Sequence, residues 1–393
     1  MNLSDSPGEA AFRLEVRAWL AENRATAPHL DPVPDGEQVT RWRRWSRRLY
    51  EAGYVGLSWP LDQGGRGLPL AYQAIWLEES ARAEIPDHIG VIGLDMAGPT
   101  ILHWGSAAQK ARFVPPLMRG DEIWCQGFSE PDSGSDLAAI RTSAVLDDDA
   151  WVVNGQKVWS SFAHIADWCI LLVRTDRHAR KHAGLSYLLV DMHAPGITVV
   201  PLPQLTGDPE FNEIFFEDVR VPRDSILGGA GDGWQVAMTT LSHERGTHGI
   251  ALAARLEADM QAALYLLSEE LDGGPKPLAD PIVADELARL WVELQALKIT
   301  NLRSLATLAR TRQPGPESTI SKLHWSEINQ RLAELVTRAL GPAGLEHWSS
   351  GPADRARWSF ARLRSRGNTI EAGTSEILRN IIAERVLGLP RSR

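Results

Sequence analysis

The chain has 393 residues, of which 44% are hydrophobic and 23% are charged, a composition that is ordinary for a globular protein of two or three domains. Its 41 basic and 50 acidic residues give a formal net charge of −9, which argues against nucleic acid or an anionic membrane surface as the main partner. An anionic small ligand is still compatible with this charge, because a basic pocket can form locally in an acidic protein.

We expect neither a membrane segment nor a targeting signal. No apolar run approaches the roughly 20 residues of a membrane-spanning helix, and the N-terminus mixes acidic and basic residues in place of a signal or transit pattern. The two cysteines, Cys125 and Cys169, have no neighbour at metal-ligand spacing, so we expect buried thiols in a reducing compartment. Together these features predict a soluble cytoplasmic protein.

Residues 1–123 are expected to form an N-terminal helical domain. Aromatic and apolar residues recur there at helical spacing in three runs, over 41–52, 70–85 and 107–119. Each run is followed directly by a residue that typically ends a helix, namely Gly53, Pro86 and Gly120.

Residues 124–231 are expected to form a middle β domain. Asn154-Gly155-Gln156 stands between two β-prone runs, 151–153 and 157–159, which predicts a hairpin turn at this point. Further strand-like runs cover 168–174, 185–192, 197–202 and 213–221. Short strands separated by turn residues predict an antiparallel β-barrel or sandwich.

Residues 232–393 are expected to form a C-terminal helical domain of the four-helix-bundle type. Asp280 and Pro281 have the pattern of a helix N-cap followed by proline in the first turn. An apolar stripe follows at spacings of three and four residues, formed by Leu287, Leu290, Leu294 and Leu297. Two more helices are expected, one from about residue 317 and one over 375–387.

The helical, β, helical order predicts a multi-domain α+β protein and disfavours a doubly wound nucleotide-binding fold, in which strands and helices alternate. The glycine-rich run 228–233 does not match GxGxxG and lies in no βαβ unit, so we interpret it as a joining turn. His243 and His248 are five residues apart and diverge around a helix. We therefore expect no metal site, and the sequence has no Gly-x-Ser-x-Gly elbow of a serine hydrolase.

Four segments resemble acyl-CoA dehydrogenases, in the family's order. They are WCQGFSEPDSGSD (124–136), NGQKVWSSFAHIADW (154–168), FNEIFFEDVRVPRDSILGGAGDGWQVAMTTLSHERG (211–246) and TIEAGTSEILRNIIAERVLGLPR (369–391). The resemblance covers almost the whole chain. It implies helical, β and helical domains, FAD as cofactor, and oxidation of an acyl-CoA thioester to a trans-2-enoyl-CoA.

The resemblance also implies which residues bind the cofactor. Ser129 and Ser161 would hydrogen-bond the flavin ring, Trp159 would pack beside it, Phe128 would lie along its edge, and Ser135 would contact the pyrophosphate or the ligand. The remaining cofactor positions implied are Gln126, Ser160, Gly373, Thr374 and Glu376. Without the resemblance, 129–134 is a polar β-turn, and Thr374 or Ser375 is a helix cap.

The catalytic base departs from the best-known family pattern. Many members carry a glutamate directly before Gly-Thr of the last segment, where this chain has Ala372, with Glu371 one residue earlier. In a subset resembling isovaleryl-CoA and long-chain dehydrogenases, the base precedes an arginine, which here selects Glu244 before Arg245. The alternative is that Glu244 forms a surface ion pair with His248 or Arg245.

The substrate site follows from the same resemblance. The Ala372 N–H would bind the thioester carbonyl, where a hydrogen-bond donor stabilises developing negative charge. The other substrate-binding positions implied are Ser135, Ser242, Arg245 and Gly373.

The resemblance implies an electron-transfer flavoprotein as electron acceptor and a homodimer or homotetramer. An acyl-CoA oxidase is the near alternative, although oxidases commonly carry a further C-terminal domain. In the family an arginine, with a phenylalanine three residues later, often reaches the neighbouring subunit's FAD, but residues 267–280 contain neither residue type. A hetero-oligomer with a homologue, in which this chain is a weakly catalytic or non-catalytic subunit, is therefore a further alternative.

Overall fold

The computed structural model describes residues 4–28, 36–244, 248–270, 274–311, 315, 318–346 and 353–390, without the side chains at 243, 244, 248 and 353. Packing divides the chain into two compact units. One unit contains Met1–Ala21, Leu70–Glu84 and Arg245–Arg393, and the other contains Glu22–Pro69 and Ile85–Glu244. Each unit therefore combines segments that are distant in the sequence.

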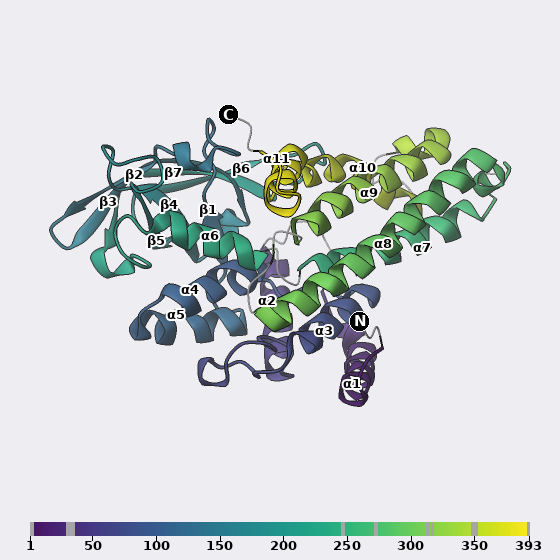
Figure 1. Cartoon of the computed structure of the whole chain (residues 1–393), viewed down its shortest axis with the longest axis horizontal. Helices are drawn as coiled ribbons and strands as arrows, with labels where there is room; N and C mark the ends of the chain where they lie inside the picture. The colour runs from purple at the N-terminus through teal and green to yellow at the C-terminus, as the bar shows by residue number, and fades with distance from the viewer. Residues whose placement is uncertain are drawn as a thin grey trace. The chain divides into compact units, whose positions relative to one another are not determined.

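The first unit is helical. Its long helices α7 (His248–Leu267), α8 (Pro281–Thr311), α9 (Ser318–Ala339) and α10 (Ala353–Asn368) pack side by side (Figure 1). The predicted leucine stripe of α8 is confirmed, because all four leucines are buried in one apolar core with residues of α7 and α9. The predicted cap is also confirmed, since the Asp280 carboxylate accepts a 2.8 Å hydrogen bond from the Ile282 N–H.

Two helices from the start of the chain belong to this unit as well. Helix α3 (Leu70–Arg82) packs on α7, and α1 (Pro7–Asn23) is joined to α3 by ion pairs to one buried carboxylate. Glu79 of α3, 4% exposed, accepts hydrogen bonds of 2.6 Å from both Arg13 and Arg17. Two arginines offset the cost of burying one carboxylate, so the ion pairs fix α1 to α3.

The second unit combines helices with a β-sheet. Its helices are α2 (Gly36–Glu51), α4 (Gly98–Trp104), α5 (Ala107–Arg119) and α6 (Gly233–Glu244). The expected helix over 107–119 has these bounds in the structure, begins at a Ser106–Gln109 capping box and ends at Gly120, whose φ is 72°. Helix α6 packs against strand β5 of the sheet (Figure 1).

In the described part of the chain, seven strands form one sheet: β1 (Trp124–Gly127), β2 (Ser143–Asp147), β3 (Ala150–Ser161), β4 (Trp168–Arg174), β5 (Leu185–Asp191), β6 (Ile197–Leu202) and β7 (Phe211–Pro222). Their order is β1-β4-β2-β3-β7-β6, with β5 paired to β4. Most neighbours are antiparallel, as expected, but β1 and β2 both run parallel to β4. The expected helical, β and helical architecture is confirmed.

The hairpin predicted at Asn154-Gly155 is wrong. Strand β3 continues through these residues and pairs with both β2 and β7. The pairing with β7 shifts register between Val153 and Gly155, and a Cβ on Gly155 would lie 2.7 Å from the Thr142 Cα. The glycine therefore serves a β-bulge and a close backbone approach in place of a turn.

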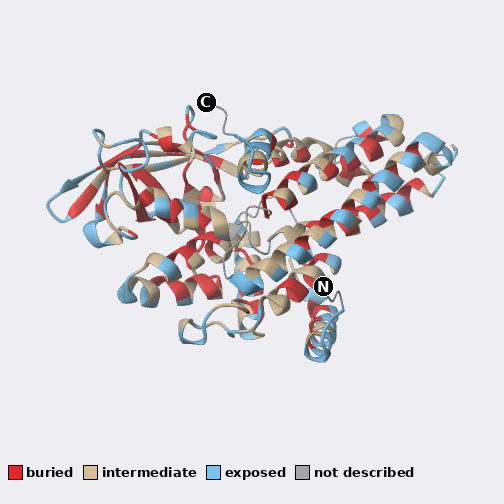
Figure 2. Ribbon diagram, in the orientation of Figure 1, coloured by how far each residue is buried: buried red, intermediate tan, exposed pale blue. Residues whose placement is uncertain are grey.

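The helical unit and the β-sheet each have a core of buried apolar residues, and Figure 2 shows these buried residues in both. Cys125 and Cys169 are fully buried free thiols and are register partners on β1 and β4, which confirms their expected role as core residues.

Within the described ranges, no helix is both long and apolar enough to cross a bilayer.

Candidate flavin and substrate site

The polar turn after β1 is held in a fixed shape beside β3. The Glu130 and Ser133 backbones exchange hydrogen bonds of 3.1 and 2.9 Å, which closes the turn. The Ser129 carbonyl accepts a 2.9 Å hydrogen bond from the Val158 N–H of β3. The turn and the β3 residues 159–161 are thus brought together, although about thirty positions separate them in the sequence.

A buried ion pair supports this turn from within the sheet. The Lys157 ammonium is fully buried and lies 2.9 Å from the Glu130 carboxylate and 3.0 Å from the Phe128 carbonyl. Glu130 also accepts hydrogen bonds from the Arg141 and Thr142 N–H groups, at 2.6 and 2.9 Å. Burial lowers the pKa of Lys157 to about 8, against the opposing effect of Glu130. Burial is the largest single effect on the pKa of Glu130 and raises it, but the Lys157 charge and the hydrogen bonds from Lys157, Arg141 and Thr142 together lower that pKa.

Several polar groups of this region have no hydrogen-bond partner among the described residues. They include the hydroxyls of Ser129 and Ser161 and the Ser129 N–H. The Gln126 amide nitrogen and the Ser160 hydroxyl are buried and likewise lack a partner in the described part. Because buried polar groups are nearly always hydrogen-bonded, the Gln126 and Ser160 groups need a partner, and together with the partly exposed Ser129 and Ser161 they fit a polar heterocycle such as the flavin ring.

Trp159 combines a strained backbone with an exposed side chain. Its φ is 61°, a conformation that is costly for a bulky residue, and its side chain is 60% exposed. The indole contacts Phe211 edge-on, with ring centroids 5.9 Å apart. Phe128 is by contrast buried against Tyr187, with ring centroids 5.8 Å apart. A large aromatic face is therefore presented outward beside the unsatisfied donors.

A second group of expected site residues lies in the helical unit, at the start of α11 (Ser375–Ile381). Ala372 and Gly373 both have positive φ, 52° and 95°, and the Gly373 carbonyl accepts a 2.9 Å hydrogen bond from Lys322. Thr374 caps the helix by accepting from the Ile377 N–H, as the sequence predicted. Within the described residues, the Ala372 N–H has no acceptor, so it is free to bind a ligand.

The structure describes the side chain of only one of the two candidate bases, Glu371. Glu371 is engaged on both carboxylate oxygens, by Asn368 at 2.6 Å and by Arg364 at 3.1 Å. Glu244 is the last residue of α6, and its side chain lies outside the described residues, as does Arg245. The fixed partners of Glu371 disfavour it as a mobile proton acceptor.

The remaining expected residues lie on accessible or partly accessible positions. Ser135 is exposed on the turn that follows Ser133. Ser242 is partly buried on α6 and donates a 2.7 Å hydrogen bond to the Thr239 carbonyl. Glu376 is exposed, and hydrogen bonds from its own N–H and from Thr374 lower its pKa, so its carboxylate is anionic at neutral pH.

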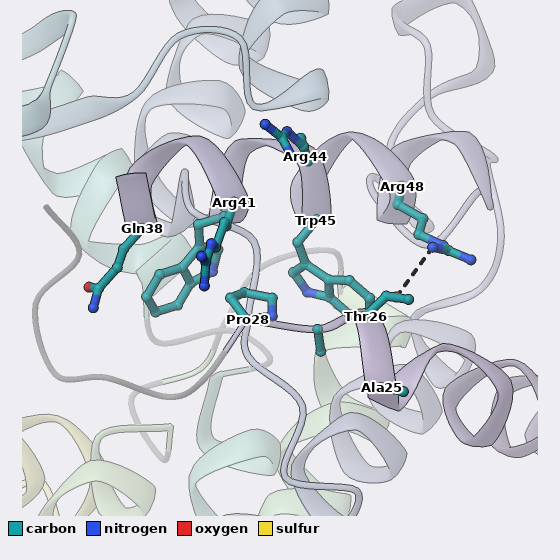
Figure 3. Close-up of a pocket in the computed structure, with 10 residues that line it drawn as sticks. Ala25, Thr26, Pro28, Gln38, Arg41, Arg44, Trp45 and Arg48 are labelled. Atoms are coloured by element: carbon teal, nitrogen blue, oxygen red, sulfur yellow. Dashed lines mark hydrogen bonds between the residues drawn. The ribbon is translucent and has the colours of Figure 1, made fainter. Parts of the chain in front are cut away.

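A pocket of about 460 Å³ lies between α2 and residues 25–28 (Figure 3). Its lining includes Thr26, Pro28, Arg41, Trp42, Trp45 and Arg48. Arg48 donates to the Thr26 hydroxyl at 3.2 Å, and Arg41 pairs with Glu37 at 3.3 Å. No residue expected to bind cofactor or substrate lines this pocket, so we do not assign it to the reaction.

The sequence interpretation missed the Lys157–Glu130 pair. Lysine is rarely fully buried without a partner, and Lys157 stands in a β-prone run, which was the available signal. Its partner could not be identified from the sequence, because Glu130 lies 27 positions earlier in what resembles an ordinary turn.

Comparisons with known proteins match almost the whole chain. Models of the acyl-CoA dehydrogenase N-terminal, middle and C-terminal domains match residues 6–121, 125–219 and 231–387. "Acyl-CoA dehydrogenase IpdE1" of Mycobacterium tuberculosis is 42% identical over 387 residues, 97% of each chain.

Two solved structures match along their whole length. The ChsE4–ChsE5 complex from Mycobacterium tuberculosis has a TM-score of 0.84 at 29% identity, covering 100% of both chains. The Tcur3481–Tcur3483 steroid ACAD has a TM-score of 0.84 at 28% identity, again covering 100% of both chains. Together with the domain matches, they show that this chain belongs to the acyl-CoA dehydrogenase family of FAD-dependent oxidoreductases.

Proposed function

We propose that the protein oxidises an acyl-CoA thioester between its α and β carbons to a trans-2-enoyl-CoA, with Glu244 as the base. The observation that carries this proposal is the left-handed turn at Ala372–Gly373, where a strained backbone leaves the Ala372 N–H without an acceptor in the described part of the chain. Strain of this kind, which costs on the order of 1–3 kcal/mol per residue, is concentrated at functional sites.

The Ala372 N–H supplies the electrostatic part of the reaction. Removing a proton from the α carbon places negative charge on the thioester oxygen, and a donor aimed at that oxygen stabilises the charge. A backbone donor held by a rigid turn needs little reorganisation during the step. Lys322 and the Thr374 cap hold this turn on either side.

Glu244 takes the α proton in this proposal. A carboxylate gains proton affinity where water is excluded, and a nearby arginine lowers it, so the adjoining Arg245 would tune the base. Glu371 is a poor alternative, because Arg364 and Asn368 already bind both of its oxygens.

When bound, FAD supplies the acceptor for the hydride that leaves the β carbon. Ser129, Ser161 and Trp159 would hold its ring, through the two hydroxyls and the exposed indole face. Gln126, Ser160 and Phe128 would support the same side, and Ser135, Gly373, Thr374 and Glu376 would line the cofactor elsewhere. Ser242, Arg245 and Ser135 would contact the substrate.

We propose an electron-transfer flavoprotein as the electron acceptor. The family resemblance supports this assignment, as does the similarity to a relative that is named a dehydrogenase. Oxygen consumption with substrate but without added flavoprotein would favour the oxidase alternative.

Anaerobic titration of the purified protein with a panel of acyl-CoA thioesters tests the proposal. We expect bleaching of the flavin absorbance by at least one straight-chain, branched or steroid-type thioester. A protein that holds FAD but is not bleached by any member of the panel would contradict it.

A second candidate function is that of a subunit completed by an unlike homologue. Residues 267–280 lack arginine and phenylalanine, and one similar solved structure is the ChsE4–ChsE5 complex. If the protein purified alone is colourless and inert, but yellow and active when co-purified with a homologous chain, this subunit function is favoured over the self-sufficient enzyme.

A further inference from the structure

The Lys157–Glu130 pair is unusually buried for an ion pair with only a structural role. Lys157 has no exposed surface and Glu130 is 8% exposed, and burying two charges costs several kcal/mol per ion before pairing is counted. A pair of apolar side chains would often be as stable. The location of the pair, directly behind the turn that carries Ser129, suggests a role in the site.

The contact of interest is the 3.0 Å hydrogen bond from the Lys157 ammonium to the Phe128 carbonyl. This carbonyl belongs to the same peptide group as the Ser129 N–H. A cation at the carbonyl oxygen polarises the peptide group and strengthens its N–H as a donor, since hydrogen bonds in chains reinforce one another at low dielectric. The Ser129 N–H has no acceptor among the described residues.

Glu130 fixes the lysine and the turn together. Its carboxylate binds Lys157 and the N–H groups of Arg141 and Thr142, while its backbone closes the turn with Ser133. The ammonium therefore cannot move away from the Phe128 carbonyl without breaking several charge-assisted hydrogen bonds.

We propose that Lys157, held by Glu130, is a positioning residue that orients and polarises the Phe128–Ser129 peptide so that the Ser129 N–H binds reduced flavin more tightly than oxidised flavin. This inference rests on the proposed function. Reduction makes the flavin ring more electron-rich, so a polarised donor discriminates between the two oxidation states and raises the midpoint potential.

The test compares Lys157→Met holoenzyme with wild type. Methionine keeps most of the length of the unbranched side chain and removes its charge. We expect the ratio of oxidised to reduced FAD dissociation constants to change by about tenfold, which lowers the two-electron midpoint potential by about 30 mV. Dye-equilibration titration measures the potential, and fluorescence of released FAD measures retention.

Lys298→Met is the matched control. Lys298 also pairs with a glutamate, Glu257, at 2.6 Å, but it lies on α8, and among the described residues no hydrogen bond or ion pair joins it to an expected site residue. Its potential should equal that of wild type. Lys157→Gln is the fallback if the methionine variant does not fold, because an amide can still donate to the Phe128 carbonyl, and its potential should fall in the same direction.

A purely structural role predicts a different result. Loss of packing alone weakens the binding of oxidised and reduced FAD equally and leaves the midpoint potential unchanged. An unchanged midpoint potential in whichever variant folds would overturn the inference. If wild type itself binds no FAD, the proposed function fails first. If wild type binds FAD and is bleached by substrate while the variants keep its potential, only the inference about Lys157 fails.

Discussion

Trp159 shows what a single residue contributes to the candidate site. Its backbone conformation is unfavourable and its indole is 60% exposed, so it adds little to the stability of the protein without cofactor. Its edge-on contact with Phe211 offsets little of this conformational cost. Such a cost is expected where a side chain is held ready for a ligand. Nothing in its local sequence predicts the positive φ, which follows from the bulged pairing of β3 with β7 near residue 160.

We expect Trp159→Ala to weaken FAD binding about tenfold, equivalent to about 1.4 kcal/mol. The free energy of unfolding of the apoprotein should change by less than about 0.5 kcal/mol, as for most exposed positions. FAD fluorescence titration and urea unfolding measure the two quantities. Trp159→Phe, which keeps an aromatic face, is the control, and equal FAD affinity in the alanine variant would refute the stacking role.

His88 is a second residue whose environment makes a testable prediction. It is buried between the end of α5 and Gly90, donating to the Met118 carbonyl and accepting from the Gly90 N–H. Burial lowers the pKa of His88 to about 4, against a smaller opposing effect of the Met118 carbonyl. The neutral ring is therefore the folded form at physiological pH.

As pH falls below about 6.5, the unfolded chain binds a proton at His88 and the folded chain does not until about pH 4. The free energy of unfolding should thus fall across this window by about 3 kcal/mol from this residue. His88→Gln keeps one donor and one acceptor without titrating, so its stability should depend less on pH between 7 and 4.5. Identical pH profiles of the two proteins in urea unfolding would contradict the account.

At the scale of elements, α5 was predicted correctly from the sequence, whereas the turn predicted within β3 was wrong. Helix α5 was predictable at both ends because its signals are local, a capping box at Ser106 and a glycine at 120. The glycine of β3 was misinterpreted because its reason is not local. Glycine is required at 155 because Thr142, thirteen positions earlier, leaves no room for a Cβ. The Asn154 side chain donates a 2.9 Å hydrogen bond to the Asp218 carboxylate across the sheet.

Gly155→Ala should therefore destabilise the sheet. An added Cβ would lie 2.6 Å from the Thr142 hydroxyl oxygen, and the φ of 147° is unfavourable for alanine. We expect a loss of about 2–3 kcal/mol in the free energy of unfolding, measured by urea denaturation. Gly134→Ala, where a Cβ would meet open space, should be nearly neutral, and a neutral Gly155 variant would show that the bulge is not sterically required.

At the scale of the whole molecule, the sequence correctly predicted the helical, β and helical order and the family. It did not predict that α1 and α3 pack with the C-terminal helices, because that grouping depends on contacts such as Glu79 with Arg13 and on the packing of α3 on α7. The expected domain boundaries after residues 123 and 231, the cytoplasmic location and the subunit composition stay predictions.

The candidate site was also predicted only in part from the sequence. The residues around Ser129 and Trp159 were located by motif, and the structure places their segments side by side. The ion pair behind them was found only in three dimensions. The identity of the catalytic glutamate is the point on which the whole account depends, since the proposed reaction assigns proton removal to Glu244 and not to Glu371.

The most direct test is rapid-mixing measurement of flavin bleaching by acyl-CoA in Glu244→Gln and Glu371→Gln. Removing a general base typically costs 10²–10⁴-fold in rate, so we predict a loss of at least about 100-fold in Glu244→Gln with FAD still bound. Glu371→Gln should bleach at close to the wild-type rate. Wild-type bleaching in Glu244→Gln, with loss in Glu371→Gln, would contradict the account.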